Sequence, residues 1–474
     1  MNTSIGQNRI PFGNNVVMIG CGSIGGGVLP LILRHLDIKP SQITIITADE
    51  RGAVEAALYG IEHIISPLTR ENYRSILANR LHEGDFLVNL SVDVSSVALI
   101  ELCQETGSLY IDTCIEPWSG FYTDPSLSVS DRSNYALRES ALALVPSHIK
   151  GPTAVLTHGA NPGLVSHFVK QALLLMAKDV GLSVALPQSR EQWAALAQQL
   201  GIKAIHVAER DTQVANCPKA RGEFVNTWSI DGFYSEGCQP AELGWGTHEK
   251  EMPPDGAECK ENSHHAIYLD RPGRLTRVRS WTPLEGAYYG FLVTHNESIS
   301  LSDYLTAFDQ GRAVYRPTCH YAYHPCDDAV LSLHELNGKN GQLQERQRLM
   351  MDEIASGMDE LGVLLMGHEK GVYWYGSRLT IEEARALAPY NNATSLQVTS
   401  TVLAGMIWAL ENPNAGIVEP EHMDFDRILE IVMPYLGEVV GVWGDWTPLK
   451  DRSILFDEDV DLSDPWQFKN MRVE

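Results

Sequence analysis

The sequence lacks an excess of basic residues. Its 36 Lys and Arg are outnumbered by 60 Asp and Glu, which gives a formal net charge of −24. Nucleic acids and anionic membranes bind basic surfaces, so this balance argues against both as partners. It is compatible with cationic substrates, although an acidic surface can equally serve only to keep an enzyme in solution.

Paired cysteines and long apolar runs are also missing. The eight cysteines are scattered without a CxxC pair, which indicates thiols in a reducing compartment rather than a disulfide framework. No stretch approaches the ~20 uninterrupted apolar residues that span a bilayer. The N-terminal MNTSIGQNRIPFGN has no basic segment followed by an apolar one. We therefore expect a soluble, cytoplasmic protein, and 474 residues predict two or three structural units.

The most informative stretch is NNVVMIGCGSIGG, residues 14–26. Its unalternating apolar residues 16–19 predict a strand buried on both faces, as in the centre of a parallel sheet. A GxGxxG motif follows, formed by Gly20, Gly22 and Gly25. These glycines allow a tight turn, the approach of a pyrophosphate and close packing of a helix. The phosphates would lie at the N-terminus of the helix that begins near Ser23 and Ile24.

Further apolar strands alternate with helical stretches after this turn, at residues 43–47, 61–65, 86–90 and 109–111. This alternation predicts a doubly wound parallel sheet, whose ligands lie at the carboxyl ends of the strands. Polar side chains follow two of these strands and are our candidates for contacts to the cofactor and substrate: Asn89, Ser91 and Asp93 after one, and Asp112, Thr113 and Glu116 after the other.

Two candidate residues, Asp93 and Asn161, have an alternative interpretation, and a third, Asp49, lies slightly outside its expected position. Asp93 can equally cap a helix that begins near Ser95. Asn161, in HGANPG, precedes a proline suited to the first turn of a helix and is either a cap or a ligand-binding amide. Asp49 is the candidate for the acidic residue that selects NAD over NADP, but it lies slightly past the end of the second strand.

Acidic and aromatic side chains gather in the middle third of the chain. Residues 203–210 alternate as a strand that places Glu209 on an apolar face, where a carboxylate needs a cationic partner. That partner is either an internal arginine or an ammonium substrate. In FVNTWSIDGFYSEG, Phe224, Asn226, Trp228 and Ile230 are expected to share a strand face, with Glu236 after a glycine turn. Trp228 is then either core or a cation-π platform.

A strand at residues 291–294 is expected to end at His295, which is suited to proton transfer but, taken alone, is more often structural. The nearby CHYAYHPC, residues 319–326, lacks the paired cysteine knuckles of structural zinc sites, so we predict no metal. A hairpin at residues 361–376 extends a second, larger α+β domain that contains a large sheet. A helix is expected from Ser395 to Leu410.

Nine of these segments resemble bacterial homospermidine synthases along essentially the whole chain: GCGSIG, NLSVD, YIDTCIEPW, GANPGLVS, IHVAERDTQ, FVNTWSIDGFYSEG, AELGWGTHE, GFLVTHNES and YRPTCHYAYHPC. The more distant resemblance is to saccharopine and carboxynorspermidine dehydrogenases. It implies an NAD-binding Rossmann domain at residues 1–150, completed by about 391–420. An α+β substrate-binding and dimerisation domain would occupy residues 151–390, and a C-terminal extension residues 421–474.

The resemblance further implies a homodimer that binds NAD and joins two putrescine molecules, or spermidine and putrescine, into homospermidine. A hydride leaves an amine-bearing carbon, a second amine replaces the first on the imine, and the hydride returns. Trp228 would hold an ammonium between Glu209 and Glu236, and His295 would transfer protons. The approach and the inner end of the site would be lined by Asp93, Glu236, Asn161 and Glu116.

The sequence departs from the family at Thr47, where an acidic residue is expected, which leaves Asp49 as the ribose contact. One alternative function is a saccharopine-type dehydrogenase, but its α-carboxylate substrates need arginines and Arg210 is the only basic residue in the two key motifs. The other alternative is a sensor that binds NAD and polyamines without turnover.

Overall fold

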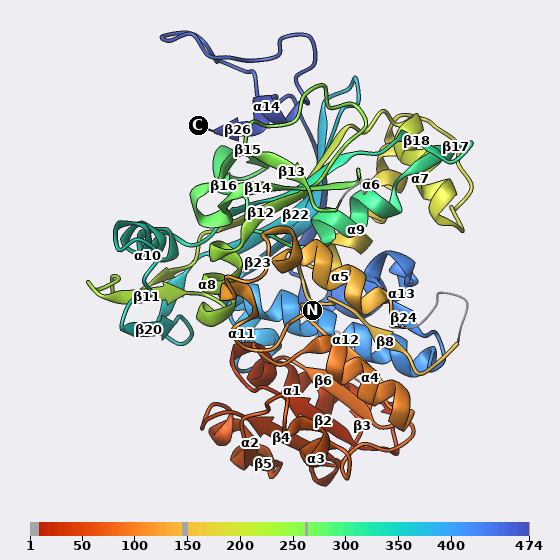
Figure 1. Cartoon of the computed structure of the whole chain (residues 1–474), viewed down its shortest axis with the longest axis vertical. Helices are drawn as coiled ribbons and strands as arrows, with labels where there is room; N and C mark the ends of the chain where they lie inside the picture. The colour runs from red at the N-terminus through yellow and green to blue at the C-terminus, as the bar shows by residue number, and fades with distance from the viewer. Residues whose placement is uncertain (1–8, 145–149, 261–263, 474) are drawn as a thin grey trace.

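The computed structural model describes residues 9–144, 150–260 and 264–473, so residues 1–8 of the N-terminal stretch lie outside it. Within the described residues, a smaller parallel sheet and a larger mixed sheet lie one below the other in Figure 1. All eight cysteines are free thiols.

The smaller sheet contains seven parallel strands among the described residues, in the order β24-β8-β7-β6-β2-β4-β5. The strands are β2 (Val16–Ile19), β4 (Ile43–Thr47), β5 (Glu62–Ile65), β6 (Phe86–Asn89), β7 (Leu109–Asp112), β8 (Ala154–Val155) and β24 (Ile417–Val418). From β2 the chain winds first to β4 and β5, then back to β6. The predicted doubly wound sheet is thus confirmed, and its switch point lies between β2 and β6.

Strand β2 is buried on both faces, as its apolar run predicts. Val16 and Met18 belong to one hydrophobic cluster, and Val17 and Ile19 belong to another. The helices of this part of the chain are α1 (Ser23–His35), α2 (Ala53–Tyr59), α3 (Tyr73–Leu77), α4 (Ser96–Thr106) and α5 (Asn134–Leu142).

The edge of the smaller sheet is formed by segments far apart in sequence. Strand β24 pairs with β8, and the long helix α12 (Ala393–Glu411) packs against α1. Figure 1 shows α12 between the two sheets. It is long and apolar enough to span a membrane, but 89% of that stretch is buried inside the protein. The division of the chain into domains stays a prediction.

The larger sheet has a main path of β13-β14-β12-β19-β9-β22-β23-β25, to which β16, β15 and β26 are joined through β19. Its strands are β9 (Ala204–Asp211), β12 (Pro240–Gly244), β13 (Gly256–Glu258), β14 (Ala266–Pro272), β15 (Arg277–Thr282), β16 (Gly286–Phe291), β19 (Thr318–His324), β22 (Met358–Met366), β23 (Val372–Thr380), β25 (Glu438–Gly444) and β26 (Arg472–Val473). The predicted hairpin is β22–β23.

Helices contact this sheet on the side that faces the rest of the core. They include α6 (Leu164–Asp179) on β22 and β23, and α9 (Asn296–Tyr304) on β12 and β19. In β9, Ile205 and Val207 belong to the main core, whereas Ala204 and Ala208 belong to the cluster on the other face. The predicted alternation of this strand is therefore confirmed.

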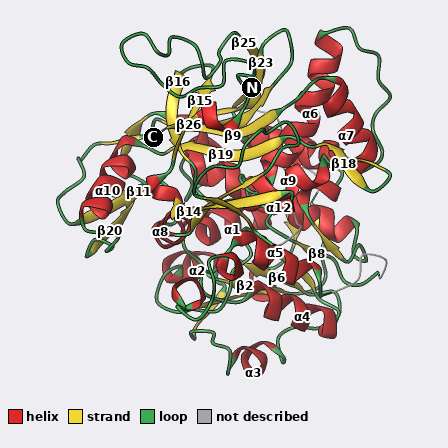
Figure 2. Cartoon of the chain, turned by 45° about the horizontal axis from the view of Figure 1, so that its top comes forward, coloured by secondary structure: helices red, strands yellow, loops and turns green. Residues whose placement is uncertain are grey.

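The remaining helices are α7 (Arg190–Gln199), α8 (Ile230–Cys238), α10 (Asp327–Gly338), α11 (Ile381–Leu387), α13 (Phe425–Val432) and α14 (Phe468–Met471). Short ribbons pair β1 (Ile10–Pro11) with β3 (Leu36–Asp37), β10 (Val214–Ala215) with β21 (Ile354–Ser356), β11 (Glu223–Asn226) with β20 (Arg346–Leu349), and β17 (Ala307–Asp309) with β18 (Arg312–Tyr315). Figure 2 shows α6 and α7 at one end of the larger sheet and α10 with β11 and β20 at the other.

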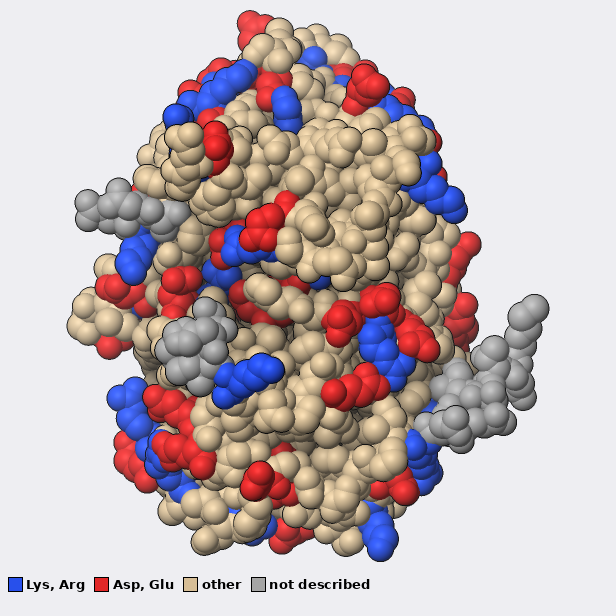
Figure 3. Space-filling view, turned by 90° about the vertical axis from the view of Figure 1, so that its right-hand side faces the viewer, with Lys and Arg blue, Asp and Glu red and all other residues tan. Residues whose placement is uncertain are grey.

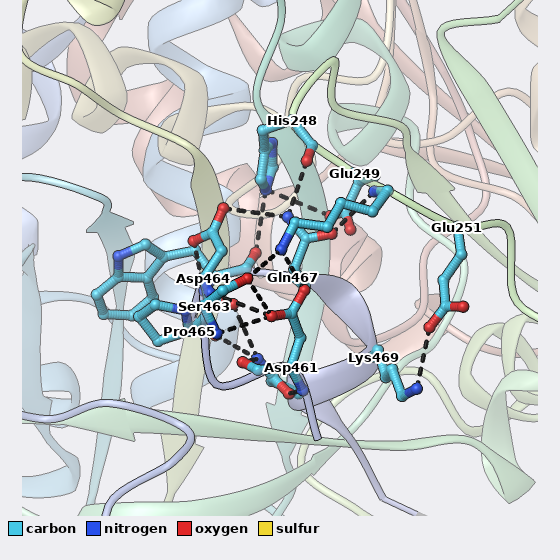
Figure 4. Close-up of polar contacts among 12 residues, drawn as sticks. His248, Glu249, Glu251, Asp461, Ser463, Asp464, Pro465, Gln467 and Lys469 are labelled. Atoms are coloured by element: carbon cyan, nitrogen blue, oxygen red, sulfur yellow. Dashed lines mark hydrogen bonds and ion pairs between the residues drawn. The ribbon is translucent and has the colours of Figure 1, made fainter. Parts of the chain in front are cut away.

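The C-terminal segment covers the second face of the larger sheet. Trp466, Phe468 and Met471 pack into the cluster formed by Ala204, Ala208 and other sheet residues. Polar contacts hold the segment in place. Glu249 accepts the N–H of Phe468 at 2.9 Å, and Gln467 donates to the His248 carbonyl at 2.8 Å. Figure 4 shows Gln467 beside His248 and Glu249.

Two local predictions are wrong. The strand of FVNTWSIDGFYSEG ends at Asn226, because the Ser229 hydroxyl accepts the N–H of Gly232 and begins α8. Glu236 is thus helical. The strand before His295 ends at Phe291, and His295 immediately precedes α9. Of the two interpretations left open for Asn161, the helix cap is excluded, since α6 begins only at Leu164.

The surface has no dominant basic area on the face shown in Figure 3. Lys and Arg side chains lie beside Asp and Glu there, and a broad uncharged area occupies much of the upper half. The picture agrees with the acidic balance of the sequence.

We expect Phe468→Ala to destabilise the protein because the ring is 1% exposed. Loss of a buried phenylalanine costs ~3–5 kcal/mol. Phe456→Ala, in the same segment but 81% exposed, is the matched control and should change stability little. Thermal and urea unfolding followed by circular dichroism would measure both; equal effects would contradict the packing described.

Candidate active site

A cavity of about 1160 Å³ opens at the carboxyl ends of the smaller sheet. Residues that follow β2, β4 and β6 line one side of it, and α8 and β14 of the other part of the chain line the opposite side. Among the predicted site residues, its lining includes Gly20, Gly22, Ser23, Ile24, Asp49, Ser91, Asp93 and Glu116.

The glycine turn has the geometry that a dinucleotide needs. Gly20 has φ +84°, and a Cβ there would lie 2.7 Å from the Leu90 carbonyl oxygen. A Cβ on Gly25 would lie 2.8 Å from the Gly20 carbonyl oxygen, so this glycine permits the close helix packing. A Cβ on Gly22 would meet nothing within 4 Å and would enter the open space where phosphates approach. The turn therefore fits NAD or NADP.

Asp49 supplies the carboxylate at the end of β4. The Thr47 hydroxyl donates to the backbone carbonyl of Asp49 at 2.6 Å. The Asp49 carboxylate accepts hydrogen bonds from Arg51, which lower its pKa. Because Asp49 lines the cavity and Thr47 is engaged locally, Asp49 remains the predicted ribose contact.

Besides Gly25, three predicted cofactor residues are absent from the cavity lining. Asn89 accepts the Ser91 hydroxyl at 2.6 Å, and Asp112 accepts the Thr157 N–H at 2.6 Å and the Tyr110 hydroxyl at 2.8 Å. Burial raises the pKa of Asp112 to about 7. Thr113 follows Asp112 and is likewise absent from the lining. Contact of all three with NAD stays a prediction.

Asp93 belongs to the cavity and not to a helix cap. The cap of α4 is Ser95, whose hydroxyl accepts the N–H of Ala98. Asp93 has φ +63°, and its N–H donates to the Glu116 carboxylate at 3.4 Å. Glu116 is 8% exposed, and burial raises its pKa to about 7.

The remaining predicted site residues are not part of this lining: Asn161, Glu209, Trp228, Glu236 and His295. Among them, the His295 ring lies between two carboxylates. Its Nε2 is 3.2 Å from Glu236 and its Nδ1 is 3.2 Å from Glu297. Burial lowers the pKa of His295, but the charges of Glu297 and Glu236 outweigh it and raise the pKa to about 10. His295 is therefore an imidazolium at neutral pH and can donate a proton but not accept one.

Glu209 has uncharged hydrogen-bond partners. The Tyr321 hydroxyl donates to it at 2.5 Å and the Asn161 amide at 2.8 Å. Burial raises its pKa to about 7, and the nearby Asp211 carboxylate adds to this rise. Within the described residues no arginine pairs with it: the neighbouring Arg210 instead contacts Glu285 and Asp327. An internal arginine as partner is thus excluded there.

Trp228 lies in an aromatic group behind this network. Its indole N–H donates to the Tyr323 hydroxyl at 3.0 Å, and its ring lies 5.4 Å from that of Phe233. The rings of Tyr321 and Tyr323 are stacked at 5.1 Å, and Tyr321 also lies 4.3 Å from His295. The structure thus brings Trp228, Glu209, Asn161, Glu236 and His295 together.

Glu297, Tyr321 and Tyr323 were missed as site residues by the sequence prediction. The alternation of β19 could have shown that both tyrosines share one face, because this strand runs parallel to β9 with Tyr323 opposite Glu209. His320 lies on the other face, where its ring centroid is 3.9 Å from that of His206 and the two rings are tilted by 35°. In the described part of the chain, no group of three His, Cys, Asp or Glu side chains could hold a metal ion.

The doubly wound sheet and its glycine-lined cavity are typical of dinucleotide-dependent enzymes. The family model of the saccharopine dehydrogenase NADP binding domain matches residues 16–155, and that of the saccharopine dehydrogenase C-terminal domain matches residues 159–445. Yeast saccharopine dehydrogenase, at 12% identity and a TM-score of 0.51 over 91% of this chain and 100% of that chain, shares the fold.

Much closer similarity links the chain to homospermidine synthases. The enzyme of Blastochloris viridis is 57% identical over 97% of both chains, and that of Mesorhizobium japonicum is 54% identical over 97% of this chain and 96% of its own. The crystal structure of Legionella pneumophila homospermidine synthase in complex with NAD has 51% identity and a TM-score of 0.92, covering 98% of this chain and 99% of that chain. The chain belongs to the homospermidine synthase family.

Proposed function

We propose that the protein is an NAD-dependent homospermidine synthase. It would convert two putrescine molecules to homospermidine and ammonia, or spermidine and putrescine to homospermidine and diaminopropane. The observation that carries this proposal is the excess of carboxylates around a single imidazolium beside the dinucleotide cavity: Glu209 and Glu297 are buried, and Glu236 is partly buried. The similarity to named homospermidine synthases supports it.

A cationic diamine is the substrate that this charge distribution favours. Buried carboxylates lose free energy of hydration and need positive partners. Putrescine carries two ammonium groups, and Trp228 with Tyr321 and Tyr323 offers aromatic surface of the kind that attracts ammonium ions. Glu116 and Asp93, which line the cavity, would guide the approach of the diamine.

Cofactor and proton transfer have separate sites. The glycine turn and Asp49 would hold NAD, which when bound accepts a hydride from an amine-bearing carbon and returns it to the imine. An ammonium must lose a proton before its carbon can lose hydride. Glu209, with a pKa of about 7, can accept that proton, and the protonated His295 can donate one to the departing amine.

The alternative, a saccharopine-type dehydrogenase, would have to bind α-carboxylates. Arginine supplies the bidentate contacts that carboxylates need. Arg210, the basic residue in the key motifs, is directed to Asp327 and Glu285 and away from Glu209. The geometry therefore favours a plain polyamine.

A product assay tests the proposal directly. Purified protein with putrescine and catalytic NAD should form homospermidine and ammonia in equal amounts without net NADH. Accumulation of NADH without homospermidine would instead indicate a dehydrogenase. Binding of NAD and putrescine without any product would indicate a sensor, and either result would refute the proposal.

The proton-acceptor role of Glu209 predicts a pH dependence. Glu209 must be ionised to accept a proton, so kcat/KM should rise with pH through about 7, the pKa of this group in the protein without substrate. Glu209→Gln should lower kcat by at least ~100-fold and remove this acid limb. Steady-state rates from pH 5.5 to 9 would measure it.

Glu249→Gln is the matched control. Burial raises the pKa of Glu249 to about 7 as well, but this side chain lies under the C-terminal segment in Figure 4. Its replacement should leave the acid limb in place. An acid limb that persists in Glu209→Gln and disappears in Glu249→Gln would contradict the assignment.

A further inference from the structure

Arg51 bridges two carboxylates that come from different parts of the chain. Its Nε lies 2.9 Å from Asp49 Oδ2, its Nη2 lies at the same distance, and its Nη1 lies 3.2 Å from Asp231 Oδ2. Asp49 and Arg51 follow strand β4, whereas Asp231 lies in the first turn of α8. All three side chains line the cavity.

This group lies after β4, the position at which a doubly wound fold distinguishes NAD from NADP. An acidic side chain after the second strand binds the ribose hydroxyls of NAD, whereas a free arginine nearby accommodates the 2′-phosphate of NADP. The chain has both residue types here. The matching family model describes an NADP binding domain, whereas the similar Legionella structure contains NAD, so the presence of Arg51 alone does not decide between them.

The contacts of Arg51 favour NAD over NADP. Asp49 holds the Nε and Nη2 side of the guanidinium, and Asp231 holds Nη1. One positive charge is thus shared by two negative charges, which leaves this group with a net charge of −1. The 2′-phosphate of NADP would have to displace one of these carboxylates from Arg51. The displaced carboxylate would stay nearby and repel the phosphate.

We propose that Asp231 is a specificity-determining residue that excludes 2′-phosphorylated dinucleotides by holding Arg51. The proposal rests on the NAD dependence proposed above. The choice between NAD and NADP would then depend on both sides of the cavity, because Asp49 and Arg51 follow a strand of the smaller sheet and Asp231 lies on α8. The matching segment of the NADP-type domain, residues 16–155, does not contain this residue.

A merely structural role for Asp231 predicts something else. A carboxylate in the first turn of a helix is stabilised by the helix dipole. If Asp231 served only α8, its replacement would lower thermal stability and would affect NAD and NADP binding equally. The ratio of the two dissociation constants separates the two roles.

Calorimetric titration of the purified protein with NAD and with NADP tests the proposal. Wild type should bind NAD more tightly. Asp231→Asn should lower the ratio of the NADP to the NAD dissociation constant by about fivefold, the effect that one exposed ion pair can reach. Asp231→Asn combined with Arg51→Ala should lose this gain, because the gain needs a free guanidinium.

Asp270→Asn is the matched control. Asp270 lines the same cavity from β14, and within the described residues its carboxylate makes no ion pair with Arg51. This variant removes the same charge and should leave the ratio within about twofold. Equal effects of Asp231→Asn and Asp270→Asn, or an unchanged ratio in Asp231→Asn with intact NAD binding, would overturn the inference alone. A wild-type protein that binds neither dinucleotide would overturn the proposed NAD dependence as well.

Discussion

Carboxylates that are buried without enough cations to neutralise them are the feature on which the rest of the site depends. Glu236 and Glu297 share one imidazolium, and Glu209 has only uncharged donors, Asn161 and Tyr321. This arrangement opposes folding, because a buried carboxylate loses its hydration. It persists inside a large core that supplies the opposing free energy. A cationic ligand would supply the positive charge that these carboxylates lack within the protein, and it would be bound through that attraction.

Helix α8 connects this inner group to the dinucleotide cavity. Ser229, Ile230, Asp231, Tyr234 and Ser235 line the cavity, while Glu236 on the same helix contacts His295. Phe233 packs between Trp228 and Tyr323. Asp231, which pairs with Arg51, and Glu236, which contacts His295, both lie on α8. Any displacement of α8 would therefore change the surroundings of Arg51 and of His295 together.

Local patterns predicted the parts of the fold that local interactions determine. The apolar run of β2, the glycine turn and the alternation of β9 each follow from neighbouring residues. The alternation of side chains from Phe224 to Ile230 predicts a single strand, although the strand ends at Asn226. The Ser229 cap overrides this pattern, and Gly232 leaves room for the Trp228 ring, which would lie 3.2 Å from a Cβ there.

Pairings between distant residues were beyond the reach of such patterns. Tyr321 and Glu209 are 112 positions apart, and Arg51 and Asp231 are 180 apart. The resemblance to homospermidine synthases correctly identified the family, and it grouped Glu236 with His295, which the structure places 3.2 Å apart. The roles of these residues and of Glu209 stay predictions. The resemblance could not show that Glu297 is the second partner of His295, nor that the neighbouring charges keep His295 protonated.

The central claim is that ionised Glu209 binds an ammonium group. Calorimetric titration of the NADH-loaded protein with putrescine at pH 6 and pH 8 tests it most directly, with 1,4-butanediol as the uncharged analogue. A group with a pKa of about 7 predicts that affinity rises about tenfold between these pH values, with proton release on binding near neutrality. The diol should not compete. An affinity that is independent of pH, or a diol that binds as tightly as putrescine, would contradict the account.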